Sequence, residues 1–201
     1  MGKKVVLVIL DQFADWEGAF ISNALMSGEI SQDNTVLWAS IDKEPKRSIG
    51  HMTVLPDIAL AEIPEDADAL LLIGGNSWRT EEAKKVSPVV ERFRDAGKLV
   101  GFICDATYFA AENGFLNDIK HTGNDPEELK KAMGYTGSAN YVLENALADQ
   151  GIVTANGNSP VQFASLIMEE LEAADPENIK MWSDFYTIGY LDAMRKYGFL
   201  K

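Results

Sequence analysis

Short apolar runs that do not alternate with polar residues recur along the chain, and amphipathic stretches separate them. The apolar runs are residues 5–10, 35–40, 69–73, 99–104 and 152–154, and the amphipathic stretches are residues 16–26, 81–96, 106–112 and 160–171. Strands that are apolar on both faces are typical of a parallel sheet covered by helices on both sides. Their alternation with helices indicates right-handed βαβ units. The pattern therefore predicts an α/β fold around a mostly parallel sheet.

The chain length predicts one domain, because 201 residues are too few for two well-built ones. The sequence contains no internal repeat, low-complexity tract or Gly/Ser/Pro-rich linker. We expect the α/β domain to span residues 1–174, with a short surface helix at 125–133, and a helical extension to span 175–201. The extension carries Trp182, Phe185, Tyr186 and Tyr190. Packing on the same domain explains these aromatic residues most simply, and a subunit interface or a pocket lid remain alternatives.

The chain is acidic, since 18 Lys and Arg residues against 31 Asp and Glu residues give a formal net charge of −13. Nucleic acids and anionic membranes both favour basic patches, so neither is an expected partner. No segment approaches the ~18 consecutive apolar residues of a membrane span, and the run at 5–10 lacks the cleavage site of a signal peptide. We therefore expect a soluble, cytoplasmic protein.

Cys104 is the only cysteine, which excludes an internal disulfide and a metal site built from several thiolates. The two histidines are far apart and give no zinc or haem pattern. Neither a dinucleotide-binding glycine motif nor a P-loop occurs. We expect neither a cofactor nor a metal.

Cys104 ends an apolar strand, and a helix-forming stretch begins directly after it. This layout is typical of a nucleophile elbow, a tight turn that lifts one side chain above the carboxyl edge of a sheet. The small Ala106 suits such a turn, whereas Phe102 suits it less well. A cysteine at a helix N-terminus is favoured as the thiolate. The alternative is an inert cysteine that packs as a small hydrophobe.

Two further motifs fall at the same edge of the predicted sheet. Gly74 and Gly75 follow a strand directly, and their backbone N–H groups, with that of Asp105, could hold an oxyanion. Glu17 lies just after the first strand, so the parallel arrangement brings it towards Cys104. A half-buried carboxyl beside a thiol could keep its proton and donate a hydrogen bond to the thiolate. The alternatives are an ordinary tight turn for the glycines and a helix-dipole partner for Glu17.

These residues, taken together, resemble a known family. The motifs are Phe-Ala-Asp-Trp-Glu at 13–17, Gly74-Gly75, Ile103-Cys104, Lys-His-Thr at 120–122, and Thr-Ala-Asn-Gly at 154–157 with Phe163-Ala164. Their order and spacing over roughly residues 3–171 are similar to those of the ThiJ/PfpI family, within the class I glutamine amidotransferase-like superfamily. The resemblance implies a flavodoxin-like three-layer sandwich, usually a homodimer. It also implies Cys104 as nucleophile, Glu17 as its protonated partner, and Gly75 and Asp105 as backbone donors.

The chain departs from the family at the residue after the cysteine. Peptidase members carry a histidine there, whereas this chain carries Asp105, whose charge opposes thiolate formation. The distant His-x-Glu of true glutamine amidotransferases is also absent. His51 is expected to be structural. His121 and Gly74 are candidate accessory residues, with His121 as a candidate base. Peptidase and amidotransferase activities are therefore not expected.

The resemblance implies a cysteine-dependent enzyme acting on a small carbonyl or amide, with glyoxalase, deglycase or amidase chemistry. In that hypothesis Cys104 adds to the electrophilic carbon while Glu17 moves the proton. The main alternative is a non-catalytic, redox-sensing or chaperone-like dimer in which Cys104 is oxidised. A third hypothesis is a scaffold in which Cys104 is inert.

Overall fold

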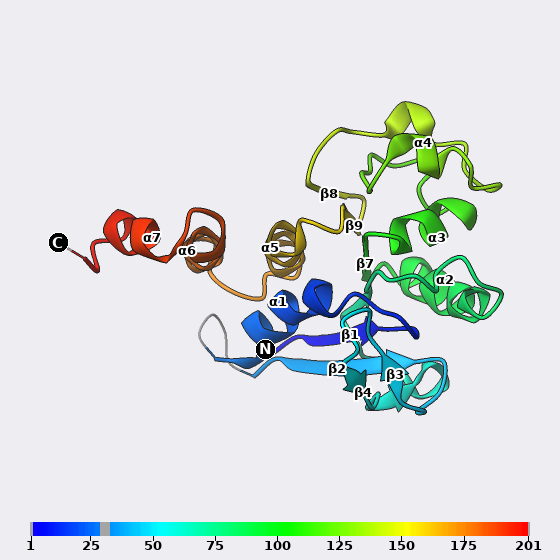
Figure 1. The fold of residues 1–201 in the computed structure, drawn as a ribbon, viewed down its shortest axis with the longest axis horizontal. Helices are drawn as coiled ribbons and strands as arrows, with labels where there is room; N and C mark the ends of the chain where they lie inside the picture. The colour runs from blue at the N-terminus through cyan, green and yellow to red at the C-terminus, as the bar shows by residue number, and fades with distance from the viewer. Residues whose placement is uncertain (1, 29–32, 201) are drawn as a thin grey trace.

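A computed structural model describes residues 2–28 and 33–200 of the chain. A seven-stranded sheet lies at its centre, with the strands side by side in the order β5, β2, β1, β6, β7, β9, β8 (Figure 1). The strands are β1 (Lys4–Val8), β2 (Thr35–Ser40), β5 (Ile58–Ala59), β6 (Ala69–Leu72), β7 (Leu99–Ile103), β8 (Ala146–Asp149) and β9 (Ile152–Ala155). Neighbouring strands are parallel except β8, which is antiparallel to β9. The predicted mostly parallel sheet is confirmed.

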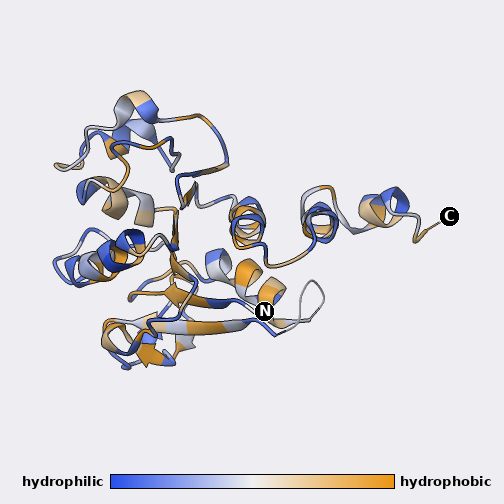
Figure 2. Cartoon of the chain, turned by 180° about the vertical axis from the view of Figure 1, so that it is seen from behind, coloured by the Kyte–Doolittle hydropathy of each residue, from blue (hydrophilic) through white to orange (hydrophobic). Residues whose placement is uncertain are grey.

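Helices cover both faces of this sheet (Figure 1). One face carries α1 (Asp15–Met26) and α5 (Pro160–Glu170), and the other carries α2 (Ser87–Asp95) and α3 (Ala106–Glu112). Adjacent residues of a strand enter different layers, because Leu7 packs with the α1 and α5 core while Val8 packs with the α2 and α3 core. This explains why the central strands are apolar throughout, and it confirms the flavodoxin-like three-layer sandwich. Figure 2 shows hydrophobic residues concentrated in the central strands.

The stretch at 81–96 was predicted as one helix, and this prediction is wrong in its first part. A 3₁₀ turn (Ala83–Val86) comes first, and α2 begins at Ser87. Pro88 explains the break, because a proline has no N–H to donate and fits only the first turn of a helix. The surface helix predicted at 125–133 is shorter, since α4 (Pro126–Leu129) begins after Asp125, whose carboxylate accepts from the backbone N–H of Glu127.

Three short strands, β3 (Lys46–Arg47), β5 and β8, were not predicted from the sequence. β3 pairs with β4 (Thr53–Val54) in a separate hairpin, and β5 also has two residues, too few to show any periodicity. β8 reads Ala-Leu-Ala-Asp, which is a poor strand sequence, and it is half-buried at the sheet edge. Antiparallel pairing with β9 therefore determines its conformation, rather than local propensity.

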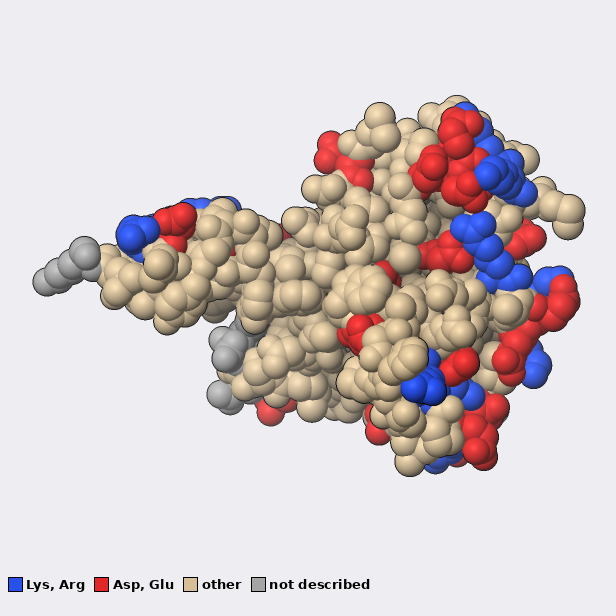
Figure 3. Space-filling view, in the orientation of Figure 1, with Lys and Arg blue, Asp and Glu red and all other residues tan. Residues whose placement is uncertain are grey.

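The last two helices extend away from the sandwich (Figure 1). α6 (Pro176–Thr187) packs on α5 through Ile179 and Trp182, which are buried in the same core as α1 and α5. α7 (Tyr190–Lys196) packs on α6. In the view of Figure 3 the charged side chains gather around α2, α4 and the β3–β4 hairpin, and few lie between these elements and the extension. Within residues 2–28 and 33–200, no helix combines the length and the apolar character that crossing a membrane requires.

Gly101, in the middle of β7, allows α5 to pack closely on the sheet. A Cβ atom at this position would lie 2.7 Å from Phe163 Cζ and 2.8 Å from Leu71 Cδ2, and both side chains are buried. We expect Gly101→Ala to lower the free energy of unfolding by about 1–3 kcal/mol, measured by urea denaturation. Adding Phe163→Leu removes the nearest ring atoms, so the double variant should lose less than the sum of the two single losses. Additive losses would contradict this packing.

Candidate active site

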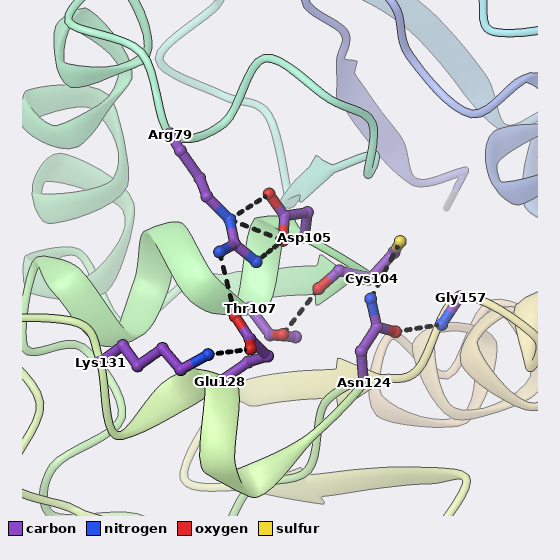
Figure 4. Close-up of polar contacts among 8 residues, drawn as sticks. All are labelled: Arg79, Cys104, Asp105, Thr107, Asn124, Glu128, Lys131 and Gly157. Atoms are coloured by element: carbon purple, nitrogen blue, oxygen red, sulfur yellow. Dashed lines mark hydrogen bonds and ion pairs between the residues drawn. The ribbon is translucent and has the colours of Figure 1, made fainter.

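Cys104 occupies the sharp turn between β7 and α3. Its φ angle is 59°, a left-handed conformation that costs a residue other than glycine about 1–3 kcal/mol. Backbone contacts hold the turn: the Cys104 N–H donates to Ala155 O at 3.0 Å, and the Thr107 hydroxyl donates to Cys104 O at 2.6 Å (Figure 4). The turn ends β7 at Ile103, one residue earlier than predicted. It presents the half-buried thiol at the carboxyl edge of the sheet.

Glu17 lies in the first turn of α1, and its side chain is 0% exposed. Its Oε2 atom accepts the backbone N–H of Gly74 at 2.8 Å. Its Oε1 atom is buried and lacks a hydrogen-bond partner of ordinary geometry within residues 2–28 and 33–200, and the carboxyl interacts with the Cys104 thiol. The structure therefore brings the two principal predicted residues together, and we call them the Glu17–Cys104 pair.

Two glycines leave room for this pair. A Cβ atom at Gly74 would lie 2.4 Å from Glu17 Oε2 and 2.5 Å from Cys104 Cβ. A Cβ atom at Gly157 would lie 2.8 Å from the Cys104 sulfur and 2.9 Å from Glu17 Oε1. Any larger residue at either position would push the carboxyl and the thiol out of place. Gly74, predicted as an accessory residue, contacts Glu17 directly.

The two predicted backbone donors, Gly75 and Asp105, come after the neighbouring strands β6 and β7. Gly75 has a φ of 147°, and the bridge between Phe13 and Gly75 uses the N–H groups of Ala14 and Asn76 but not that of Gly75. The Asp105 N–H interacts with the cysteine sulfur. Both residues lie at the carboxyl edge of the sheet, and their role as oxyanion donors stays a prediction.

The Glu17–Cys104 pair titrates as one unit, because the two groups share a hydrogen bond. Burial raises the pKa of Glu17 from 4.5 to about 7. If Glu17 is the group that loses the first proton, burial and then the charge of its carboxylate raise the pKa of the Cys104 thiol to about 12. The pair therefore carries a single negative charge above a pH of about 7, and it holds its second proton until strongly alkaline pH.

Hydrogen-bond donors favour the sulfur as the site of that charge. The Asn124 side-chain N–H donates to the Cys104 sulfur at 3.3 Å, and the Asp105 backbone N–H also reaches it. The carboxyl of Glu17 receives one donor, the N–H of Gly74. Asn124 is itself fixed, because its Oδ1 accepts the Gly157 N–H at 2.9 Å (Figure 4). From these contacts we propose that the pair is a thiolate with the proton on Glu17 Oε1.

Arg79 offsets the negative charge of Asp105, which follows the cysteine. Its guanidinium binds both carboxylate oxygens of Asp105, at 2.6 Å from Nη2 and 2.9 Å from Nε, and also contacts Glu128 (Figure 4). The guanidinium lies 3.9 Å from the centre of the Tyr108 ring. Hydrogen bonding with Asp105 raises the pKa of Arg79, so this cation remains charged. We call this ion pair between Arg79 and Asp105 the Arg79 clamp. The cation partly neutralises the Asp105 carboxylate and so limits its repulsion of a thiolate.

The structure places both histidines outside the Glu17–Cys104 pair. The His121 side chain is 0% exposed, with one ring nitrogen on Ile119 O at 2.9 Å and the other on the Tyr135 hydroxyl at 2.7 Å. Burial lowers the pKa of His121, which keeps the ring neutral. Its two nitrogens are thus occupied by structural contacts. His51 is exposed and contacts Arg47.

An open cleft of about 450 Å³ leads to the thiol. It is lined by Trp16, Cys104, Asn124, Asn145, Asn156, Gly157 and Asn158. Neither Arg79 nor Asn124 was predicted from the sequence as a site residue. Arg79 lies in the loop after the Gly74-Gly75 motif. Its position at the carboxyl edge of the sheet is the one sequence feature that could have identified it as a site residue. Asn124 lies in a loop with no such signal.

Comparison with known proteins supports the fold and the motifs. The model of the DJ-1/PfpI family matches residues 3–170. The chain belongs to the DJ-1/PfpI family. The resemblance inferred from the sequence motifs is thereby confirmed.

Two solved structures of the family are similar to this chain. A DJ-1 superfamily protein from Agrobacterium tumefaciens is 35% identical, with a TM-score of 0.84 over 91% of this chain and 97% of that one. A ThiJ/PfpI family protein from Bacillus anthracis is 26% identical, with a TM-score of 0.89 over 97% and 95%. The relative named uncharacterized protease YdeA, from Bacillus subtilis, is 35% identical over 98% of this chain and 97% of its own.

The buried carboxyl makes the stability of this DJ-1/PfpI chain depend on pH. Between pH 4.5 and about 7 the folded chain keeps a proton on Glu17 that the unfolded chain releases, so the free energy of unfolding falls as the pH rises. We expect this group to contribute a fall of about 2–3 kcal/mol, and Glu17→Gln to lack it. Urea denaturation across this pH range measures the difference between wild type and variant. The exposed Glu91→Gln should follow wild type, and a pH-independent difference for Glu17→Gln would contradict the raised pKa.

The Arg79 clamp should set the pH at which Cys104 becomes reactive. Arg79→Gln leaves the Asp105 charge unbalanced beside the pair, so the pH midpoint of Cys104 alkylation by iodoacetamide should rise by about 0.5–1 unit. Asp105→Asn should lower the midpoint, because the Asp105 charge raises the pKa of Glu17. The double variant should return close to wild type. An unchanged midpoint in Arg79→Gln would show that the clamp is only structural.

Proposed function

We propose that this chain is a cysteine-dependent enzyme that acts on a small carbonyl compound, with small amides as a second substrate class. The observation that carries the proposal is the Glu17–Cys104 pair, in which a buried carboxyl without another partner for Oε1 meets a thiol at the base of an open cleft. A nucleophile and a proton donor in direct contact are what addition to a carbonyl requires.

The proposed first step needs one proton, and the pair supplies it. The thiolate of Cys104 bonds to the carbonyl carbon, and the π electrons of the C=O bond move to the oxygen. The N–H groups of Gly75 and Asp105 stabilise the developing oxyanion. Glu17 then transfers its proton to this oxygen and becomes a carboxylate, which gives a neutral hemithioacetal.

An amide substrate adds a requirement, because the departing nitrogen must also be protonated. Glu17 is the acid in contact with the thiol among the described residues, and it is wholly buried. It can protonate an atom bonded close to the sulfur more readily than the leaving amine of a long peptide. Relatives such as YdeA carry the word protease in their names. For this chain the bonded position of His121 argues against a Cys-His peptidase mechanism.

A redox-sensing role is the second candidate function, and the open approach to the sulfur favours it. Oxidation by peroxide would convert the thiolate to a sulfinate, whose oxygens could accept from Asn124 and from a protonated Glu17. This role requires no substrate and no turnover. It predicts a mass gain of two oxygen atoms on Cys104 under mild peroxide, with no activity on carbonyls or amides.

Turnover of small carbonyl compounds tests the catalytic proposal. We expect Cys104→Ala to abolish activity, and Glu17→Gln to lower kcat by about 10²–10⁴-fold because it removes the proton donor but not the nucleophile. Glu91→Gln, an exposed change of the same chemistry, should keep wild-type activity. Activity of Cys104→Ala equal to wild type would contradict the proposal. Oxidation of Cys104 without any turnover would favour the second candidate.

A further inference from the structure

The cleft above Cys104 is lined by neutral amides. Four of its seven lining residues are asparagines, namely Asn124, Asn145, Asn156 and Asn158, and none of the seven is Asp, Glu, Lys or Arg. The chain as a whole has 18 basic and 31 acidic residues, so a cleft lined by none of them differs from the overall composition. Pockets use a few placed polar groups to select their ligands, and here those groups are carboxamides.

The inner asparagines are fixed, and the outer ones have free hydrogen-bonding capacity. Asn124 bonds the cysteine sulfur and the Gly157 N–H, and Asn156 Oδ1 accepts from Asn158 N and the Ser159 hydroxyl. The side-chain amide of Asn158 has no hydrogen-bond partner among the described residues. Asn145 has one long contact, at 3.4 Å, from Asn156 Nδ2 to its Oδ1. A ligand can therefore use amide donors and acceptors at the outer part of the cleft.

A carboxamide offers both a donor and an acceptor, and a hydroxyl group offers the same. A carboxylate offers acceptors alone and brings a charge that the lining does not balance. The cation that lies near the cysteine turn, Arg79, is already bound to Asp105 and Glu128. An anionic substrate would also approach a chain of net charge −13 and a thiolate.

Trp16 adds a flat wall to the same cleft. Its indole Nε1 donates to Gly157 O at 2.9 Å, which fixes the ring, and the residue is 44% exposed. Since the N–H is satisfied, the ring faces a ligand mainly with apolar surface. A polyhydroxylated carbon chain combines C–H faces, which pack on an aromatic ring, with hydroxyl groups directed to the amides.

We infer that the substrate at Cys104 is an uncharged carbonyl compound that carries hydroxyl groups, such as a short open-chain sugar. This inference rests on the proposed addition of Cys104 to a carbonyl and names the substrate class. The hydroxyl groups bind Asn145 and Asn158, the carbon chain lies against Trp16, and the carbonyl carbon meets the sulfur. The hemithioacetal then forms with the proton from Glu17, and no other reactant is needed.

Protection of the single cysteine measures binding without requiring turnover. Iodoacetamide alkylation of Cys104 is followed in the presence of glyceraldehyde, propionaldehyde or glyoxylate, compared at equal concentrations of the unhydrated carbonyl form. Propionaldehyde lacks the hydroxyl groups, and glyoxylate replaces them with a carboxylate. We expect glyceraldehyde to protect at a concentration at least ~10-fold lower than either, since two added hydrogen bonds of about 1 kcal/mol each are worth that factor or more.

A variant with a cation in the cleft provides a second test of the preference for uncharged substrates. Asn158→Lys places a cation in the cleft, so protection by glyoxylate should improve by about 5–10-fold while protection by glyceraldehyde weakens. Asn178→Lys makes the same change on an exposed position of α6, outside the cleft, and should leave both values as in wild type.

Three outcomes overturn the inference. Equal or better protection of wild type by glyoxylate or propionaldehyde, with Cys104 still forming carbonyl adducts, overturns the substrate class and leaves the proposed function standing. If Asn158→Lys and Asn178→Lys change the protection by glyoxylate and glyceraldehyde equally, the asparagines do not select the substrate. If no carbonyl compound protects and Cys104 reacts as an ordinary thiol of pKa ~8.5 or higher, the proposed function fails as well.

Discussion

The buried contact between Glu17 Oε1 and the Cys104 thiol is the interaction on which the site depends. A carboxyl with no exposed surface and one backbone donor is costly to ionise, so it keeps a proton to about pH 7. The thiol beside it has two donors directed at its sulfur. The pair can thus hold one negative charge and one proton at neutral pH, which are the two components of a nucleophilic addition.

The sheet provides the position of this pair, and glycines provide the space. β1 leads to α1 and Glu17, β6 leads to Gly74, and β7 leads to Cys104, all at one edge of neighbouring parallel strands. Gly74 and Gly157 allow the carboxyl and the sulfur to approach without a side chain between them. The strained backbone of Cys104 is held by contacts of β9 and α3 on either side. The strain is local, and the surrounding packing stabilises it.

The sequence was sufficient to predict five of the seven strands of the sheet and the two principal residues of the site. The apolar runs and the cysteine at a strand end can be recognised from the local sequence pattern. The parallel arrangement of the strands then brings Glu17 towards Cys104. Arg79 and Asn124 could not be found in this way, because they reach the site from loops whose paths depend on tertiary packing. His121 was predicted as a candidate base from its position in the sequence. In the structure its ring nitrogens instead contact Ile119 and Tyr135, outside the Glu17–Cys104 pair.

The location of the single charge is the central claim, and the ultraviolet absorbance of the thiolate measures it most directly. Cys104 is the only cysteine, so the difference between wild type and Cys104→Ser across a pH titration reports this sulfur alone. The account predicts that thiolate absorbance rises with a midpoint near pH 7, when the pair loses its first proton. A thiol that stays protonated until well above pH ~8.5 would place the charge on Glu17 and contradict the account.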